Sequence, residues 1–269
     1  TLMNMPMAEV YEVASFYHHF EIIQAVDVDG ATLDGEVPTL TIRVCDGLSC
    51  EMAGAQALIK RLPAVLGDPS IRIIPSPCMG RCEQAPLAMV HQRAVPHATT
   101  ESVQIQVSAH MDRQKCIRNQ AVAGVNTAYD AINNIAYSDS ISLDAYQQQG
   151  GYELASRLAT GQLDADSVIA AMDDSGLRGL GGAGFPAGRK WRIVRNEVAP
   201  KLMAVNIDEG EPGTFKDRTY LESDPHRFIE GMLIAALVVG VDACYIYLRD
   251  EYHDCRRMLD RELAKLQAN

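Results

Sequence analysis

The chain has 269 residues, 47% of them hydrophobic, and a formal net charge of −11. This length suits two domains of ordinary size, and the hydrophobic content excludes a largely disordered chain. The acidic balance disfavours nucleic-acid binding, because a negatively charged surface repels phosphate backbones. The longest apolar run, residues 231–241, is well short of the roughly 20 residues that a spanning helix needs, and no signal segment opens the sequence. We therefore expect no membrane insertion and a cytoplasmic location.

The first part of the chain alternates between helical and strand patterns. The pattern predicts an amphipathic helix leading into a strand within residues 1–25, a turn-rich loop at 27–38, a strand at 39–44, a helix at 51–66, and strands at 71–74 and 87–91. This order is typical of a compact α/β unit.

The second part follows a polar, weakly patterned stretch at residues 92–150. Two helical segments come first, followed by a glycine-rich loop at 176–188, a strand at 202–208, a polar loop at 209–218, a helix at 225–240, a strand at 243–250 and a helix at 251–267. Strands alternating with helices predict a mostly parallel sheet. Because the sequence opens on Thr1 and ends within a helical pattern, we expect it to be part of a longer subunit.

Four of the seven cysteines form two pairs. Four residues separate Cys45 from Cys50, and three separate Cys78 from Cys82. Each pair follows a predicted strand, so neighbouring strand ends would bring the thiols together, as an iron–sulfur cluster requires. A structural zinc site uses the same ligands and similar spacing and stays an alternative, whereas disulfides would need an oxidising compartment.

The other three cysteines, Cys116, Cys244 and Cys255, lack cluster spacing. We expect Cys244 to be a buried strand residue.

The sequence around the four paired cysteines resembles a known family. The segments PMAEVYEVASFYHHF, VCDGLSC and PCMGRCEQAP are similar to the thioredoxin-like [2Fe–2S] subunit of respiratory NADH dehydrogenases, the 24 kDa type, over about residues 1–95. The resemblance implies a [2Fe–2S] cluster held by Cys45, Cys50, Cys78 and Cys82. Because this family usually begins with further helices, we expect a segment before Thr1.

The glycine-rich segment, GLRGLGGAGFPAGRKW at residues 176–191, contains a literal G-x-G-x-x-G at Gly179, Gly181 and Gly184. A Rossmann fingerprint requires a strand directly before it, and a helical stretch precedes it here, so a standard dinucleotide fingerprint is not supported. Glycines still let backbone N–H groups approach a phosphate or a flat ring, and Arg189 and Lys190 can neutralise phosphate charge.

The acidic segment, VNIDEGEPGTFKDR at residues 205–218, places Asp208, Glu209 and Glu211 at the end of a predicted strand. Strand ends are where α/β sheets bind ligands, and carboxylates there accept hydrogen bonds from the hydroxyls of a flavin or nicotinamide nucleotide. A solvated acidic loop and an oxygen-only Mg²⁺ site are the alternatives.

Together these two segments resemble the flavin-binding 51 kDa subunit of NADH dehydrogenases, over about residues 143–269. The resemblance implies an FMN and NAD(H) site formed by Gly179, Gly181, Gly182, Gly184, Phe185, Lys190, Asn206, Asp208, Glu209 and Glu211. Glu211 is the candidate nicotinamide contact, and no general base or nucleophile is assigned. The sequence departs from the family pattern at Leu180, where Arg is usual, at Gly210, where Ser is common, and after Trp191, where a Phe is missing.

These resemblances predict an α/β chain with three parts. We expect a thioredoxin-like [2Fe–2S] domain at residues 1–110, a linker or extension at 111–142, and the N-terminal part of a Rossmann-like FMN- and NAD-binding domain at 143–269. In the 51 kDa family a [4Fe–4S] cluster follows, so we expect one beyond residue 269.

The combination implies a diaphorase subunit that passes electrons between iron–sulfur clusters, FMN and NAD⁺/NADH. The two segments are most similar to the β subunit of NAD-dependent formate dehydrogenases. That resemblance implies a molybdenum- or tungsten-containing partner subunit with further iron–sulfur clusters, on which formate is oxidised. A complex I-type NADH dehydrogenase, a diaphorase of an NAD-reducing hydrogenase, and a zinc-binding interaction module are the alternatives.

Overall fold

The computed structural model describes residues 6–16, 38–121, 140–180 and 182–268. The chain divides into two compact units, Thr1–Arg113 and Gln114–Asn269. None of the helices in the described ranges is long and apolar enough to cross a bilayer.

The first unit is built on a four-stranded sheet with the strand order β2-β1-β3-β4. Its strands are β1 (Leu40–Cys45), β2 (Ile71–Ser76), β3 (Ala88–Val90) and β4 (Arg93–Val95). β1 and β2 are parallel, whereas β3 is antiparallel to both β1 and β4. Three of the four strands predicted for this part of the sequence are present, and the short strand β4 is an addition.

The helices of this unit are α1 (Met7–Phe16), α2 (Leu48–Met52), α3 (Ala55–Leu66), the 3₁₀ helix η1 (Cys82–Gln84) and α4 (Thr100–Ala121). The helix predicted at residues 51–66 is divided in two, because Gly54 has a left-handed backbone conformation with φ of 96°. The strand predicted to end the 1–25 segment lies outside the described residues. Helix α4 occupies part of the stretch expected to be a linker. Its polar, weakly patterned sequence did not predict a helix there.

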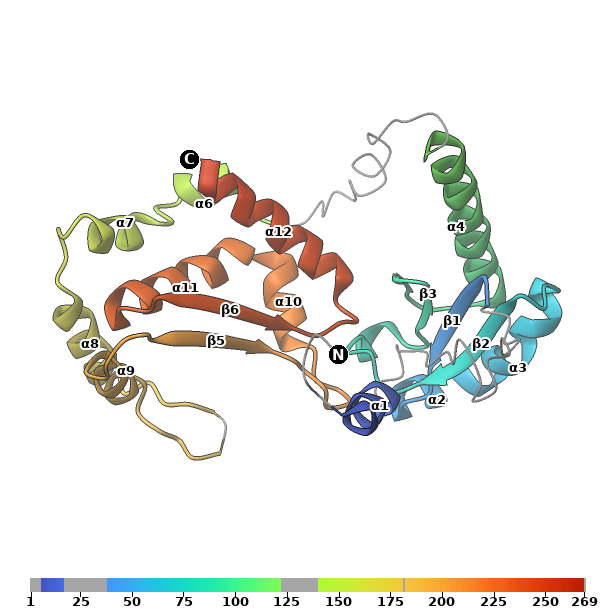
Figure 1. The fold of residues 1–269 in the computed structure, drawn as a ribbon, viewed down its shortest axis with the longest axis horizontal. Coiled ribbons are helices and arrows are strands. Elements are labelled where there is room, and N and C mark those ends of the chain that lie inside the picture. Colours follow the sequence, from blue (N-terminus) through green and yellow to red (C-terminus); the bar gives the residue numbers. More distant parts are fainter. Residues whose placement is uncertain (1–5, 17–37, 122–139, 181, 269) are drawn as a thin grey trace. The chain divides into compact units, whose positions relative to one another are not determined.

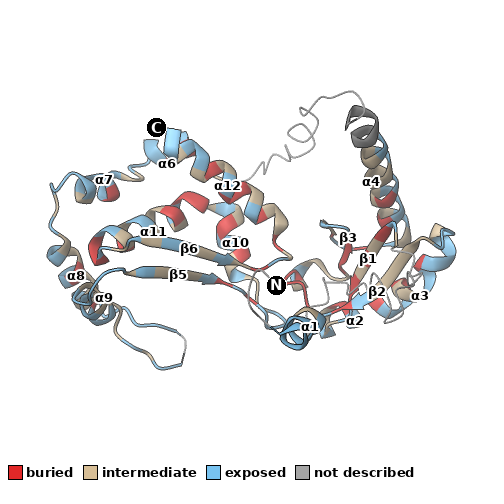
Figure 2. Cartoon of the chain, in the orientation of Figure 1, coloured by how far each residue is buried: buried red, intermediate tan, exposed pale blue. Residues whose placement is uncertain are grey.

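The core of the first unit lies between the sheet and its helices. Ile42 of β1, Leu62 of α3 and Val103 of α4 are each 0% exposed and belong to one hydrophobic cluster. The end of β1, where the first cysteine pair begins, is buried as well, with Val44 0% and Cys45 2% exposed; Figure 2 colours the buried residues of this unit red.

The second unit contains two parallel strands, β5 (Leu202–Ile207) and β6 (Ala243–Leu248). Its helices are α6 (Leu143–Gln148), α7 (Glu153–Ala159), α8 (Ala165–Asp174), α9 (Ala187–Arg195), α10 (Lys216–Ser223), α11 (Pro225–Val239) and α12 (His253–Ala268). The parallel pairing predicted from the sequence is present, and α11 ends at Gly240 with φ of 72°. Helices α9 and α10 begin inside segments that the sequence predicted as loops.

Helices α11 and α12 carry many of the buried residues in the second unit (Figures 1 and 2). Ile229 of α11, Cys255 of α12 and Tyr252 are 0% exposed within one hydrophobic cluster. Cys244, by contrast, is exposed, so its predicted burial was wrong. It lies near the start of β6, which has a strand partner on only one side among the described residues.

A buried polar cluster attaches the α6–α7 segment to α11. His226 is 0% exposed, and its Nδ1 lies 3.0 Å from the hydroxyl of Tyr152. The Tyr146 hydroxyl donates to Glu230 at 2.6 Å. Burial is the main cause of two pKa shifts here: it lowers the pKa of His226 and raises the pKa of Tyr152. Residues 143–159 are therefore packed against the same unit as β5 and β6.

Candidate functional site

The four paired cysteines lie together beside the ends of β1 and β2. Cys45 is the last residue of β1 and is paired with Ser76 at the end of β2. Cys50 lies in α2, and Cys82 begins η1. The sulfurs of Cys78 and Cys82 are 3.4 Å apart. The Cys78–Cys82 contact joins one predicted pair, but among the described residues no group of three or more His, Cys, Asp or Glu side chains is arranged to hold a metal ion.

A hydrogen bond between Cys45 and Cys78 shifts the pKa values of these two thiols in opposite directions. A hydrogen bond from Cys78 is the main cause that lowers the pKa of Cys45, and the Gly47 backbone N–H contributes, against the opposing effect of burial. The same bond and burial raise the pKa of Cys78 far above its ordinary value. The Cys45 thiol is thus the easier one to ionise. Metal binding to such a site releases the remaining protons.

The backbone around the thiols passes close to them. A Cβ atom added at Gly47 would lie 3.5 Å from the Cys45 sulfur and 3.5 Å from the Cys78 Cβ, both ordinary van der Waals distances. Ser76, paired with Cys45, is 1% exposed, and its hydroxyl has no hydrogen-bond partner among the described residues.

The glycine-rich segment forms a closed loop that leads into α9. Arg178 and Pro186 form an isolated antiparallel bridge, and the Gly179 N–H donates to the Phe185 carbonyl at 2.9 Å. The Arg178 guanidinium donates to the Gly184 carbonyl at 2.9 Å, which holds the far side of the loop. Gly181 lies outside the described residues.

The tip of this glycine loop is open to solvent. Gly182 and Gly184 have φ of 90° and 57°, which glycine adopts without strain. Leu180 is 100% exposed, and Phe185 is 42% exposed with the Arg189 guanidinium 5.7 Å from its ring centre. Lys190 is exposed on the first turn of α9, whose N-terminus favours anions. The loop can therefore present backbone N–H groups, an aromatic face and two cations to a phosphorylated ligand.

Gly188 sets how closely α8 and α9 pack. A Cβ atom there would lie 2.4 Å from Oδ1 of Asp173 and 2.9 Å from its backbone nitrogen. Because the Asp173 nitrogen belongs to the backbone of α8 and cannot turn aside, we expect Gly188→Ala to destabilise this unit by about 1–3 kcal/mol. Thermal unfolding and the retention of flavin are the measurements.

Gly231→Ala is the matched control for this change. Position 231 is exposed in α11 and an added Cβ meets nothing within 4 Å. The control should be stabilising by up to about 1 kcal/mol, since alanine favours helix more than glycine does. Equal stability of Gly188→Ala and the unchanged protein would contradict the close packing of α8 and α9.

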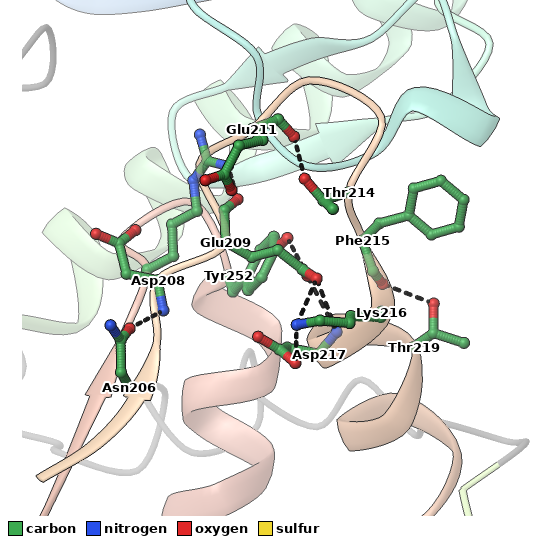
Figure 3. Close-up of polar contacts among 11 residues, drawn as sticks. Asn206, Asp208, Glu209, Glu211, Thr214, Phe215, Lys216, Asp217, Thr219 and Tyr252 are labelled. Atoms are coloured by element: carbon green, nitrogen blue, oxygen red, sulfur yellow. Dashed lines mark hydrogen bonds and ion pairs between the residues drawn. The ribbon is translucent and has the colours of Figure 1, made fainter. Parts of the chain in front are cut away.

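The acidic segment begins where β5 ends. Asn206 is paired with Tyr247 on the exposed face of the sheet, and its Oδ1 accepts from the Asp208 N–H at 2.8 Å. Asp208 and Glu211 are exposed, whereas Glu209 is 4% exposed and turned inward (Figure 3). Of the three predicted carboxylates, two are therefore available to a ligand directly.

Charged and polar residues at the end of β6 complete this region. Arg249 and Glu251 form an ion pair in which Nε lies 2.9 Å from Oε2, and Tyr252 follows them. These residues were not predicted from the sequence. The run RDEY nevertheless places charged residues directly after a strand, which is the pattern that indicated the acidic segment. Burial raises the pKa of Tyr252, so its hydroxyl stays protonated and acts as a donor.

The structure separates the glycine loop from the acidic segment. In the orientation of Figure 1 the glycine loop extends from α9 near the beginning of β5, and the acidic segment leaves the opposite end of that strand. The predicted site residues thus form two groups within one unit.

Two family descriptions match this sequence. The thioredoxin-like [2Fe–2S] ferredoxin family matches residues 1–110, and the Nuo51 FMN-binding domain matches residues 172–269. The first match favours a [2Fe–2S] cluster over zinc in the first unit.

Individual relatives agree with these matches. An NADH-quinone oxidoreductase subunit of Rhizobium meliloti is 41% identical over 139 residues, which cover 51% of this chain and 33% of that protein. The alpha subunit of the NAD-reducing hydrogenase HoxS of Cupriavidus necator is 31% identical over 98% of this chain and 44% of that protein.

A solved structure has a similar fold. A chain of an NAD⁺-reducing [NiFe]-hydrogenase in the air-oxidised state aligns with a TM-score of 0.70 and 26% identity, covering 99% of this chain and 45% of that one. The present chain therefore spans less than half the length of these relatives. It joins a thioredoxin-like [2Fe–2S] ferredoxin domain to an FMN-binding domain of the Nuo51 type, in that order along the sequence.

Proposed function

We propose that this chain is a diaphorase-type electron-transfer subunit that exchanges electrons between NAD(H) and a [2Fe–2S] cluster by way of FMN. The observation that carries the proposal is the presence of both domain types in one chain. A bound flavin exchanges a hydride with a nicotinamide and single electrons with a cluster, so the pair converts two-electron into one-electron chemistry.

In this proposal the cysteines at the ends of β1 and β2 hold the cluster. Cys45, Cys50, Cys78 and Cys82 act as thiolates, and a hydrogen bond from Cys78 lowers the pKa of Cys45. The burial of three of these cysteines keeps water away from the iron ligands. Hydrogen bonds and low exposure are the means by which a protein adjusts the potential of a cluster.

The two loops of the second unit bind the nucleotides in this proposal. Gly179, Gly181, Gly182 and Gly184 let backbone N–H groups approach the flavin phosphate, while Lys190 supplies positive charge and Phe185 an aromatic surface. Asn206, Asp208 and Glu211 offer acceptors and donors to the hydroxyl and amide groups of FMN and NAD(H). Glu209 belongs to the same site. No group of the chain is required to act as a nucleophile.

The identity of the partner that supplies or receives electrons is a separate and more specific proposal. We propose a molybdenum- or tungsten-containing subunit that oxidises formate, with NAD⁺ reduced here; the residue patterns of the glycine and acidic segments support it. A hydrogenase partner is the second candidate, favoured by the similarity to the Cupriavidus necator protein over 98% of this chain.

Purification of the subunit with its native partners tests both levels of the proposal. The diaphorase function predicts iron, acid-labile sulfide and FMN in the preparation, and NADH-dependent reduction of ferricyanide; zinc without iron or flavin would reject it. Formate-dependent NAD⁺ reduction with bound molybdenum or tungsten supports the formate partner. Hydrogen-dependent NAD⁺ reduction with bound nickel would replace it with the hydrogenase.

A further inference from the structure

The acidic segment between β5 and α10 is held by the end of β6. The Arg249 side chain belongs to a residue that is 9% exposed, and its guanidinium donates to the backbone carbonyl of Glu209. The same guanidinium contacts both oxygens of Glu251, through Nε at 2.9 Å and a terminal nitrogen at 3.1 Å. This fork geometry fixes the plane of the guanidinium, so the carbonyl it holds is fixed as well.

The side chain of Glu209 forms a second attachment (Figure 3). Both of its carboxylate oxygens lie 3.1 Å from the Asp217 backbone N–H at the start of α10. The Tyr252 hydroxyl donates to Oε2 at 3.3 Å, and the Lys216 ammonium lies 3.4 Å from Oε1. A carboxylate at a helix N-terminus is stabilised by the free N–H groups and by the helix dipole.

These contacts leave the Glu209 carboxylate committed to the protein. With 4% of the residue exposed and four contacts from three residues, it is poorly placed to meet a nucleotide. Its neighbours differ, because Asp208 and Glu211 are exposed on either side of it. The backbone held at Glu209 therefore determines where these two carboxylates lie.

We propose that Glu209, Arg249 and Tyr252 are positioning residues that hold the acidic segment so that Asp208 and Glu211 face the nucleotide. The inference deepens the proposed function, on which the role of Asp208 and Glu211 rests. It assigns Glu209 to the support of the site and adds two residues from the end of β6.

The test uses Arg249→Lys in the complete complex. Lysine keeps the charge but cannot contact Glu251 through two nitrogens and hold the Glu209 carbonyl at the same time. We expect the KM for NADH to rise about tenfold, equivalent to about 1.4 kcal/mol, with kcat changed less. Amide hydrogen exchange in residues 210–215 should become faster. FMN content and the cluster EPR signal should stay unchanged.

Arg256→Lys is the matched control, because Arg256 is exposed on α12, a few residues away. It should leave both KM and exchange as in the unchanged protein. Arg249→Lys with an unaltered KM and unaltered exchange would overturn the proposal.

Glu209→Gln separates positioning from direct contact. Glutamine keeps one acceptor oxygen and loses the other, so the positioning role predicts faster exchange in residues 210–215 together with a higher KM. Tyr252→Phe, which removes one donor, should produce a smaller change of the same kind. A higher KM with unaltered exchange in Glu209→Gln would identify Glu209 as a direct nucleotide contact and refute the positioning role.

Failure of the proposed function and failure of the positioning role give different results. If the unchanged complex lacked FMN or NADH oxidation, the proposed function would be refuted, while the exchange measurements on the variants would still report whether the attachment holds the segment. If the complex oxidised NADH and the variants matched it in exchange and KM, only the positioning role would be lost.

Discussion

Cys78→Ser is expected to abolish the [2Fe–2S] EPR signal of the reduced protein while FMN stays bound. Cys78 is 6% exposed, and its sulfur lies 3.4 Å from that of Cys82. A serine hydroxyl ionises far less readily than a thiol, and an iron–sulfur cluster requires thiolate ligands. Loss of one ligand from a group of four should therefore leave the cluster unformed or unstable. Iron and sulfide analysis, EPR and flavin absorbance together measure the outcome.

Cys244→Ser provides the control for this change. Cys244 is an exposed thiol on β6 of the other unit, so its replacement should leave both the EPR signal and the iron content intact. A full [2Fe–2S] signal in Cys78→Ser would show that this cysteine is not a ligand. Loss of FMN together with the signal would mean that the variant disturbs more than the first unit.

Glu211→Gln is expected to lower kcat/KM for NADH by about 10- to 100-fold without lowering the thermal stability. The change removes a charged acceptor, and a hydrogen bond to a charged group contributes about 1.5–3 kcal/mol. Glu211 is exposed, and its backbone carbonyl accepts from the Thr214 N–H at 3.0 Å, a contact that glutamine preserves. Steady-state kinetics and a thermal unfolding curve are the two measurements.

Glu197→Gln is a suitable control, because this exposed carboxylate follows α9 in the same unit. It should change neither kinetics nor stability. Unaltered kinetics in Glu211→Gln would remove this residue from the nucleotide site. Glu211→Gln should not make amide exchange in residues 210–215 faster, whereas Glu209→Gln should, since only the buried carboxylate supports the segment.

Most elements around the cysteines could be predicted from local sequence. The strands leading to Cys45 and Cys78 are short apolar runs with β-branched residues, and such runs bounded by turn residues indicate buried strands. Their observed bounds, Leu40–Cys45 and Ile71–Ser76, agree closely with the expected 39–44 and 71–74. The weakly patterned helix α4 was not predicted from the sequence. It is buried only where it packs against the sheet, and few of its residues are apolar enough to indicate that packing.

The burial of individual side chains in the second unit could not be read from the sequence. Cys244 has an apolar strand around it and is exposed, because a strand residue is covered only where another element packs over it. Glu209 lies between two exposed carboxylates in a polar segment and is buried, because the N-terminus of α10 and the end of β6 meet there. Nothing in the local composition distinguishes the three carboxylates.

Local sequence patterns were enough to indicate which chemistry each half of this protein carries. The spacing of Cys45, Cys50, Cys78 and Cys82, the glycine-rich segment and the acidic segment are such patterns, and their residue types point to a metal or cluster site and a nucleotide site. Which side chains face a ligand, and which support them, depends on tertiary contacts. The division between exposed Asp208 and Glu211 and buried Glu209 depends on Arg249 and Tyr252, which are distant in sequence and become neighbours because β5 and β6 pair in parallel and end at the same edge.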